Sequence, residues 1–142
     1  MQRDCHARSL CSGLAMTFEK ENMQAFELLD IIKQQSRSGK PYFEFLHVPD
    51  SPAKGTGIGM SMGVYQLLVG DTDIQSPHTE DEVYYVVEGR AKIKVADEDR
   101  DVRSGSVIYV PKKVLHRFHS IEEDLIVLVF FAPAEYSNKP SS

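Results

Sequence analysis

Two segments of the sequence carry side chains that could bind a metal ion. The first, residues 70–89, places His78 four residues before Glu82, and the second, residues 105–120, contains His116. Imidazole nitrogens and carboxylate oxygens are common ligands of divalent transition metals in proteins. Two histidines and one glutamate also leave coordination positions open for water, substrate or dioxygen. The residue types therefore predict a divalent metal site, provided that the fold brings the two segments together.

Glu80 lies between the two ligand candidates of the first segment and has two alternative roles. On a straight strand it shares the parity of His78 and Glu82, so its side chain would point the same way and could act as a fourth ligand or as a base. It is therefore the candidate catalytic residue. If residues 79–81 form a turn instead, the parity is broken and Glu80 is exposed. We expect the turn.

Apolar runs rich in β-branched and aromatic residues indicate a series of short strands. In residues 91–95, apolar residues alternate with lysines, which is typical of a strand with one buried face and one exposed face. The expected strands span residues 42–48, 60–69, 83–87, 91–95, 107–110, 115–118 and 125–131, with Val102 in a further return strand. The last of these runs is apolar at every position, as a central strand covered on both sides must be.

One stretch, residues 22–35, has helical periodicity. Asn22 is a suitable N-cap, and Gly39 suits the left-handed conformation that follows a helix. The apolar residues at the spacing of one helical face are Ala25, Leu28, Leu29 and Ile32. This pattern predicts an amphipathic helix that packs on the outside of a sheet.

Many short strands and a single helix predict an all-β fold, an antiparallel β-barrel or jelly roll with one N-terminal amphipathic helix. Such a barrel has a cavity at its mouth, where alternate residues of neighbouring strands converge. The 142 residues suit one domain, which we assign to residues 17–136. We expect flexible tails at residues 1–16 and 137–142, with fraying from Pro133 onward.

Composition limits the partners and the location of the chain. The net charge of −5, without a concentrated basic stretch, argues against nucleic acid and against an anionic membrane surface. The longest apolar run, residues 125–132, is far too short to span a membrane, so we expect a cytoplasmic protein. Cys5 and Cys11 both lie in the N-terminal tail, which fits a reducing compartment. Because two of the expected strands are apolar on both faces, we also expect a homodimer that covers them.

The two segments resemble the paired motifs of the cupin superfamily, and the resemblance extends over residues 60–133. In the first motif, Glu82 and Gly89 match, His78 stands at the place of the second histidine, and Ser76 replaces the first histidine. In the second motif Gly105, Pro111 and His116 match, while Lys113 replaces a glycine and Ser120 an asparagine. The resemblance implies the jelly-roll barrel of that superfamily.

The resemblance also implies a metal held in the barrel by His78, Glu82 and His116, with iron, manganese, zinc and nickel as the family's precedents. Its members include dioxygenases and isomerases but also sugar-binding proteins, so the fold does not specify the function. We expect a metal-binding protein, and the first of two hypotheses is a metal-dependent enzyme, dioxygenase- or isomerase-like, that acts on a small polar organic molecule in the cavity. The alternative is a non-catalytic small-molecule or sugar-binding module, in which the change to Ser76 left a degenerate metal site.

Residues flanking the proposed ligands are candidates for the walls of the cavity. Ser76 is two residues from His78, so on an extended segment both side chains leave the same face. Tyr84, Tyr109 and Phe118 are aromatic wall candidates, although a place in the core is the default for each. His119 is an odd number of positions from the metal-ligand candidate on its strand, so we expect it to face away from the cavity.

Overall fold

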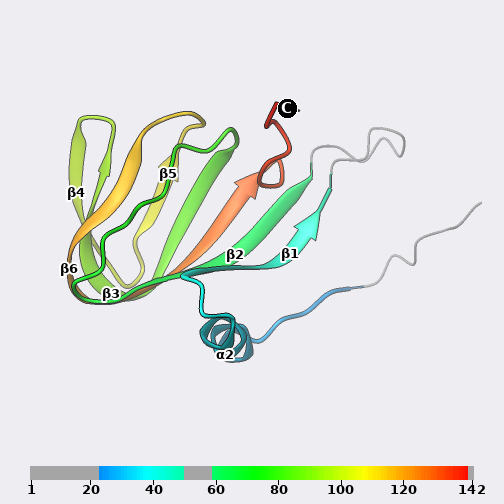
Figure 1. The fold of residues 1–142 in the computed structure, drawn as a ribbon, viewed down its shortest axis with the longest axis horizontal. Helices are drawn as coiled ribbons and strands as arrows, with labels where there is room; N and C mark the ends of the chain where they lie inside the picture. The colour runs from blue at the N-terminus through cyan, green and yellow to red at the C-terminus, as the bar shows by residue number, and fades with distance from the viewer. Residues whose placement is uncertain (1–22, 50–58, 141–142) are drawn as a thin grey trace, which may run out of the picture.

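The computed structural model describes residues 23–49 and 59–140. This part of the chain contains one α-helix followed by six strands, and Figure 1 shows the strands curling into a deep half-barrel with the helix outside it. The elements are α2 (Leu28–Ser38), β1 (Tyr42–Val48), β2 (Met60–Leu67), β3 (Asp81–Val95), β4 (Glu98–Arg103), β5 (Val107–Val110) and β6 (His116–Ala132).

Every strand pairing is antiparallel, so the predicted all-β class is confirmed. The strand order is β1-β2-β6-β3-β4, and β5 also pairs with β3. Among the described strands no ladder joins β1 to β4, so the predicted barrel is a strongly curled sheet that is not closed by hydrogen bonds.

The two longest strands each join segments that the sequence predicted as separate strands. β3 contains both residues 83–87 and residues 91–95, with Gly89 at a φ of 99° between them and register shifts on either side of it. β6 likewise continues from His116 through Ser120, at a φ of 51°, to the apolar run. A residue at positive φ acts here as a bulge, because it bends the strand without ending its ladder. The positions at which we expected these strands to end are therefore bends within two longer strands.

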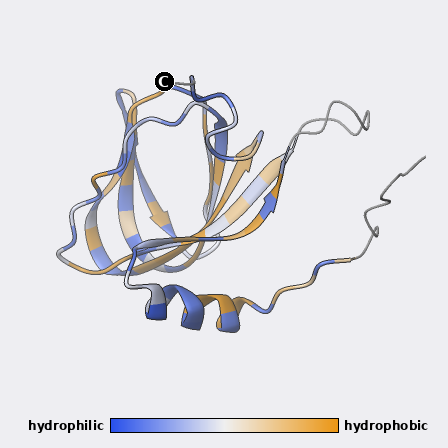
Figure 2. Cartoon of the chain, turned by 45° about the vertical axis from the view of Figure 1, so that its right-hand side comes forward, coloured by the Kyte–Doolittle hydropathy of each residue, from blue (hydrophilic) through white to orange (hydrophobic). Residues whose placement is uncertain are grey.

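The core lies inside the curl. Along β6, Leu125, Val127, Val129 and Phe131 are buried, whereas the residues between them are only partly buried. β6 is thus the central strand that the sequence predicted, but one of its faces is covered less completely than the other. Figure 2 shows hydrophobic and hydrophilic residues alternating along several strands of the sheet, as this burial pattern requires.

Helix α2 packs against β1 and β2 on the outside of the sheet, as expected, but it begins later than predicted. Glu27 is its N-cap, while Asn22 lies outside the described residues. Because the helix starts at Leu28, the face turned to the sheet carries Ile31 and Gln35, and Leu29 is 71% exposed. The expected apolar face was therefore wrong at Leu29 and also at Ala25, which precedes the helix and is exposed. The predicted C-terminal signal is confirmed, since Gly39 is left-handed with a φ of 71°.

Within the described residues, no helix is long and apolar enough to cross a membrane. The expected N-terminal tail, residues 1–16 with Cys5 and Cys11, lies outside the described part of the chain.

Candidate metal centre

The structure brings His78, Glu82 and His116 together, with one ligand atom of each lying within 4.8 Å of the other two. Glu82 Oε2 is 3.2 Å from His116 Nε2 and 3.8 Å from His78 Nε2. Both imidazoles therefore direct the same nitrogen toward one carboxylate oxygen.

The curl of the sheet explains how these residues meet. Glu82 is near the start of β3 and pairs with Val110 of β5, so the loop that follows β5 begins beside it. That loop leads directly to His116, the first residue of β6. It is tied to the other histidine by a backbone hydrogen bond of 2.6 Å, in which Lys113 N donates to His78 O. The two motifs are thus joined through main chain as well as through their side chains.

The donor set fits a divalent metal. The side chains of Glu82 and His116 are 2% and 1% exposed. Among the described residues, neither Glu82 Oε2 nor His116 Nε2 has a partner with hydrogen-bond geometry, despite their short separation. Leaving buried polar atoms unpaired is costly, and a metal ion bound between them would satisfy both. Imidazole nitrogen and carboxylate oxygen are also suitable ligands for a transition metal.

The environment shifts the pKa values of the two histidines in opposite directions. Burial lowers the pKa of His78 and so favours the neutral imidazole that binds metals. Burial also acts to lower the pKa of His116, but the adjacent Glu82 carboxylate and the Val114 carbonyl outweigh it and raise that pKa. A proton therefore competes with a metal more strongly at His116 than at His78.

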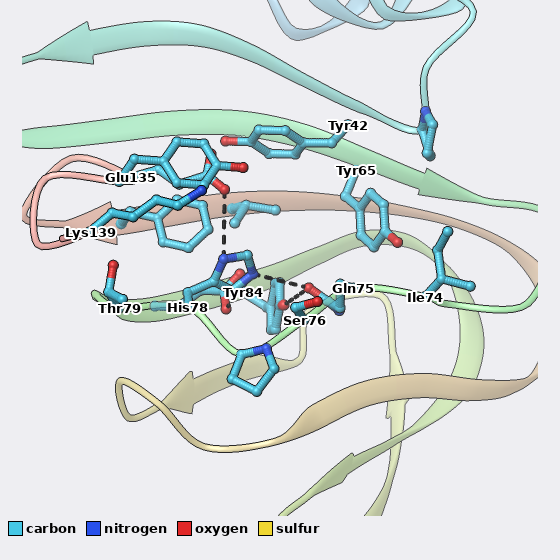
Figure 3. A pocket seen from close by; sticks show the side chains of 16 residues that line it. Tyr42, Tyr65, Ile74, Gln75, Ser76, His78, Thr79, Tyr84, Glu135 and Lys139 are labelled. Carbon is cyan, nitrogen blue, oxygen red and sulfur yellow. Dashed lines mark hydrogen bonds and ion pairs between the residues drawn. The ribbon is translucent and has the colours of Figure 1, made fainter. Parts of the chain in front are cut away.

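A cavity of about 570 Å³ opens beside the three residues, and His78 and Glu82 form part of its wall (Figure 3). This volume is within the range of small-molecule sites. Ile74, Val129 and Phe131 give the cavity an apolar wall. Ser76 and Tyr84 line it, as expected, and the other lining residues are Pro41, Tyr42, Tyr65, Gln75, Pro77, Thr79, Glu135, Tyr136 and Lys139.

A buried polar network that sequence analysis missed lies on one side of the cavity. Tyr84 donates from its hydroxyl to Gln75 Oε1 at 3.0 Å, and Gln75 Nε2 donates to Asp73 Oδ2 at 2.7 Å. Tyr65 donates to the other oxygen of Asp73, also at 2.7 Å. Gln75 Oε1 is in addition 3.4 Å from His78 Nε2, so the network reaches the metal ligands. No motif marks these residues, because they become neighbours only when the segment before β3 folds over the sheet.

The tyrosine nearest the edge of the sheet, Tyr42, has an unusual environment. Its hydroxyl is buried without a hydrogen-bond partner among the described residues, and it lines the cavity. Burial, with a smaller contribution from Glu135, raises its pKa, so the hydroxyl stays protonated and can donate. Its ring lies against the backbone of Gly63, where a Cβ atom would collide with the ring. Gly63 therefore makes room for this side chain.

Two of the expected wall residues are not in the cavity. Tyr109 is 58% exposed on the outer face of β5, where its hydroxyl donates to Asp81 Oδ1 at 3.2 Å. Phe118 is 1% exposed in the core and packs edge-on against Tyr84. The strand parity explains Tyr109, since it pairs with Val83, which alternates with the inward-facing Glu82. His119 lies away from the cavity, as expected, and pairs with Asp99.

Glu80 is neither exposed nor close enough to join the three ligands. It is 1% exposed, and its two carboxylate oxygens accept the backbone N–H groups of Tyr136 at 2.8 Å and Asn138 at 2.9 Å. The expected exposed turn is therefore wrong for Glu80. Its carboxylate is buried because it supplies acceptors to a segment of backbone that has no strand to pair with.

That segment is the C-terminal stretch, which we had expected to be frayed from Pro133 onward. Ala134 and Glu135 are instead buried, and Glu135 N donates to the buried Ser61 Oγ at 2.9 Å. The Glu135 carboxylate faces His78 across the cavity, with 3.6 Å between Oε1 and Nδ1 (Figure 3). Burial, reinforced by Glu44, raises the pKa of Glu135 to about 7.

The comparison with protein families identifies the family that the two motifs resemble. The family model "Cupin domain" matches residues 63–131. A protein of Streptomyces coelicolor, which has no assigned function, is 45% identical over 113 residues, covering 80% of this chain and 99% of its own. A second uncharacterized protein, from Methanocaldococcus jannaschii, is 30% identical over 102 residues, or 66% of this chain and 78% of its own.

Solved structures resemble the fold at low sequence identity. Protein TT1209 from Thermus thermophilus matches with a TM-score of 0.57 and 19% identity over 79% of this chain and 99% of its own. KdgF from Halomonas sp. matches with a TM-score of 0.54 and 22% identity over 65% of this chain and 76% of its own. At these identities the likeness concerns the fold alone.

Proposed function

This chain belongs to the cupin family, and on that premise we propose that it binds a divalent transition metal through His78, Glu82 and His116 and uses it on a small organic molecule. The observation that carries the proposal is that Glu82 Oε2 and His116 Nε2 are buried with no partner in hydrogen-bond geometry among the described residues, and that His78 Nε2 lies 3.8 Å from the same carboxylate oxygen. Iron, manganese, zinc and nickel all accept such ligands.

We propose that the molecule occupies the adjacent cavity and that the protein is an enzyme of the dioxygenase or isomerase type. A metal bound there would supply either Lewis-acid polarisation of a carbonyl or activation of dioxygen. Phe131 and Val129 give the cavity an apolar wall, against which the non-polar part of such a molecule would pack. The Tyr42 hydroxyl, which has no hydrogen-bond partner among the described residues, would donate to an oxygen of the ligand.

The alternative is a module that binds a small molecule without transforming it. It is favoured by Ser76, which stands where the family motif has a histidine and is itself a poor metal ligand. In that case the cavity would recognise its ligand through Tyr42, Gln75 and the apolar wall. A ligand that raises the melting temperature, with no product detected by mass spectrometry, would favour this alternative.

The proposal is tested by metal content and metal uptake. We expect protein purified without chelator to contain close to one equivalent of a transition metal, and chelator-treated protein to bind zinc. His78→Ala and His116→Ala should abolish binding, because each removes one of three ligands. His119→Ala is the matched control and should bind normally, since this histidine pairs with Asp99 on the other side of the strand. A wild-type chain that neither contains nor takes up any transition metal would refute the proposal.

A further inference from the structure

Both histidines of the metal centre have an oxygen acceptor close to Nδ1. His116 Nδ1 is 2.8 Å from the Val114 carbonyl oxygen, and His78 Nδ1 is 3.6 Å from Glu135 Oε1. A metal-binding histidine usually donates its second ring N–H to a carboxylate, a carbonyl or a water, which fixes both the tautomer and the orientation of the ring. In each ring Nε2 faces Glu82, and in His78 this nitrogen also lies 3.4 Å from Gln75 Oε1.

Glu135 is on the far side of the His78 ring from the three converging ligand atoms. It is not a member of the cluster whose ligand atoms lie within 4.8 Å of one another. Its contact is with Nδ1, whereas Glu82 lies toward Nε2 of the same ring. Glu135 is therefore placed to act on His78 rather than to replace it as a ligand. The separation of 3.6 Å is slightly longer than a direct hydrogen bond, and a small closing movement would bring the two atoms into hydrogen-bond range.

The backbone around Glu135 is held by buried side chains from two other parts of the chain. Ser61, which is fully buried in β2, accepts the Glu135 N–H at 2.9 Å. Glu80 accepts the N–H groups of Tyr136 and Asn138, and the Asn138 side chain donates to Thr79 O at 3.3 Å. Burying a serine and a glutamate is unfavourable without such bonds, so these contacts attach the C-terminal segment specifically to the rest of the domain.

We infer that Glu135 is a positioning residue that holds the His78 ring in the orientation needed to bind the metal. Ser61 and Glu80 contribute indirectly, because they attach the segment that carries Glu135 to the rest of the domain. The inference rests on the proposed metal site and adds a function for the segment after β6. It also explains three of the buried polar residues, Ser61, Glu80 and Glu135, which the metal ligands leave unexplained.

The first test compares zinc affinity in variants of the full chain, measured by competition with a chromophoric chelator at pH 8. Glu135→Gln keeps the shape of the side chain but removes its charge, and we expect it to lose about 10- to 100-fold in affinity, as is usual for residues behind a metal ligand. Asp99→Asn is the matched control, because it removes a carboxylate from His119, which is not a ligand. It should change the affinity less than threefold. Equal zinc affinity in wild type and Glu135→Gln would overturn the inference.

The second test reports on the His78 ring directly. In zinc-loaded wild-type protein, we expect the Nδ1 protons of both His78 and His116 to give slowly exchanging imidazole resonances. Glu135→Ala should broaden or remove the His78 resonance while the His116 resonance persists, because His116 donates to a backbone carbonyl that the variant does not alter. A general structural disturbance would affect both. A protected His78 resonance in the variant would overturn the inference.

The third test asks whether Glu80 acts through Glu135. Glu80→Gln weakens two charge-assisted hydrogen bonds to the C-terminal segment and should lower zinc affinity less than Glu135→Gln does. In the double variant we expect no further loss beyond that of Glu135→Gln, since both changes interrupt one connection. Additive losses would show that Glu80 acts by another route.

These outcomes separate the inference from the proposed function. Wild-type protein that binds no metal refutes both. If wild-type protein binds metal through His116 and its zinc affinity does not change in the Glu135 variants, only the inference is refuted.

Discussion

At the residue scale, the pKa of His116 sets the pH range in which the metal centre can be filled. That pKa is raised, because the Glu82 carboxylate and the Val114 carbonyl together outweigh the effect of burial. A metal must displace the proton, so zinc affinity should fall as pH falls through the raised pKa, beginning above the ordinary value of about 6.5. Below that point we expect the zinc Kd to rise about tenfold for each pH unit, because metal binding displaces one proton. A Kd that stayed constant from pH 8 to pH 6 would contradict this prediction.

Glu135 should make the metal-free protein less stable as pH rises. Its pKa is raised from 4.5 to about 7, so the folded state holds a proton that the unfolded state has released. The stability this proton contributes is fully present below pH 4.5 and is lost as pH rises through about 7. Glu135→Gln should therefore match wild type at pH 4 and exceed it by about 1–2 kcal/mol at pH 8, a figure reduced because the carboxyl borders the cavity. Urea unfolding at both pH values measures this, and a destabilised variant at pH 8 would count against it.

Ser76 marks the position at which a fourth ligand could be added. It lines the same cavity as His78 and Glu82 but is not one of the converging ligands. Imidazole binds transition metals far better than a hydroxyl does, so Ser76→His should raise the affinity for zinc or nickel. The same competition titration of both chelator-treated proteins would measure it. An unchanged or lower affinity would mean that residue 76 does not face the metal.

The three candidate ligands could be identified from the sequence, whereas the residues that surround them could not. His78, Glu82 and His116 are residue types that bind metals, and they occupy the ligand positions of the two motifs that resemble those of cupins, so the resemblance was enough to pick them out. Glu135 and Asp73 carry no such signal, since each acquires its role from a contact distant in the sequence. Asp73, for example, accepts the N–H of Phe118, which is 45 positions away. The expectation that a turn exposes Glu80 failed for the same reason, because its carboxylate accepts the backbone N–H groups of Tyr136 and Asn138, which are 56 and 58 positions away.

At the scale of elements, the bend in β3 depends on Gly89. Its φ is 99°, and a Cβ atom there would collide with the Asp124 carbonyl of β6. Gly89→Ala therefore combines backbone strain with a clash against main chain that cannot move easily, and should cost about 2–4 kcal/mol of unfolding free energy. Gly105→Ala is the matched control: its φ is 94° but nothing lies within 4 Å of the added atom, so we expect about 1 kcal/mol. Chemical denaturation of the two variants would test this, and equal losses would show that the clash contributes nothing.

The strands themselves were predicted well, but their ends were not. Apolar runs, with clear alternation in residues 91–95, located part of every paired strand of the described sheet except β4, which only Val102 marked. They divided β3 and β6, since glycine and other turn-forming residues mark bends as readily as ends. The start of α2 was misplaced for a related reason. A cap residue such as Asn22 permits a helix, but contact with β1 and β2 decides which turns are kept.

At the scale of the whole molecule, the outer face of the sheet carries a continuous apolar surface. Val83 of β3 lies between Tyr109 of β5 and Phe130 of β6, and Tyr85 lies in the same way between Val107 and Leu128. Cross-strand neighbours point to the same face, so these six side chains form two adjacent rows. Helix α2 packs on β1 and β2 and leaves these rows uncovered in the described part of the chain. Val107, Tyr109 and Tyr85 are 67%, 58% and 38% exposed.

We therefore predict that the protein is a homodimer in which these rows pack against the same rows of a second copy. A contiguous apolar patch is uncommon on a monomer, and a two-fold arrangement lets one patch cover another without a second partner. Light scattering at micromolar concentration should give twice the chain mass of 16.0 kDa.

Val107→Asp should convert the protein to a monomer with its zinc affinity intact, because this residue lies on the outside of the sheet and the candidate metal ligands lie inside it. Leu68→Asp places the same charge at an exposed leucine outside the rows and should leave the dimer unchanged. Wild-type protein that scattered as a single chain, or a Val107→Asp variant that remained dimeric, would show that this surface is not the interface.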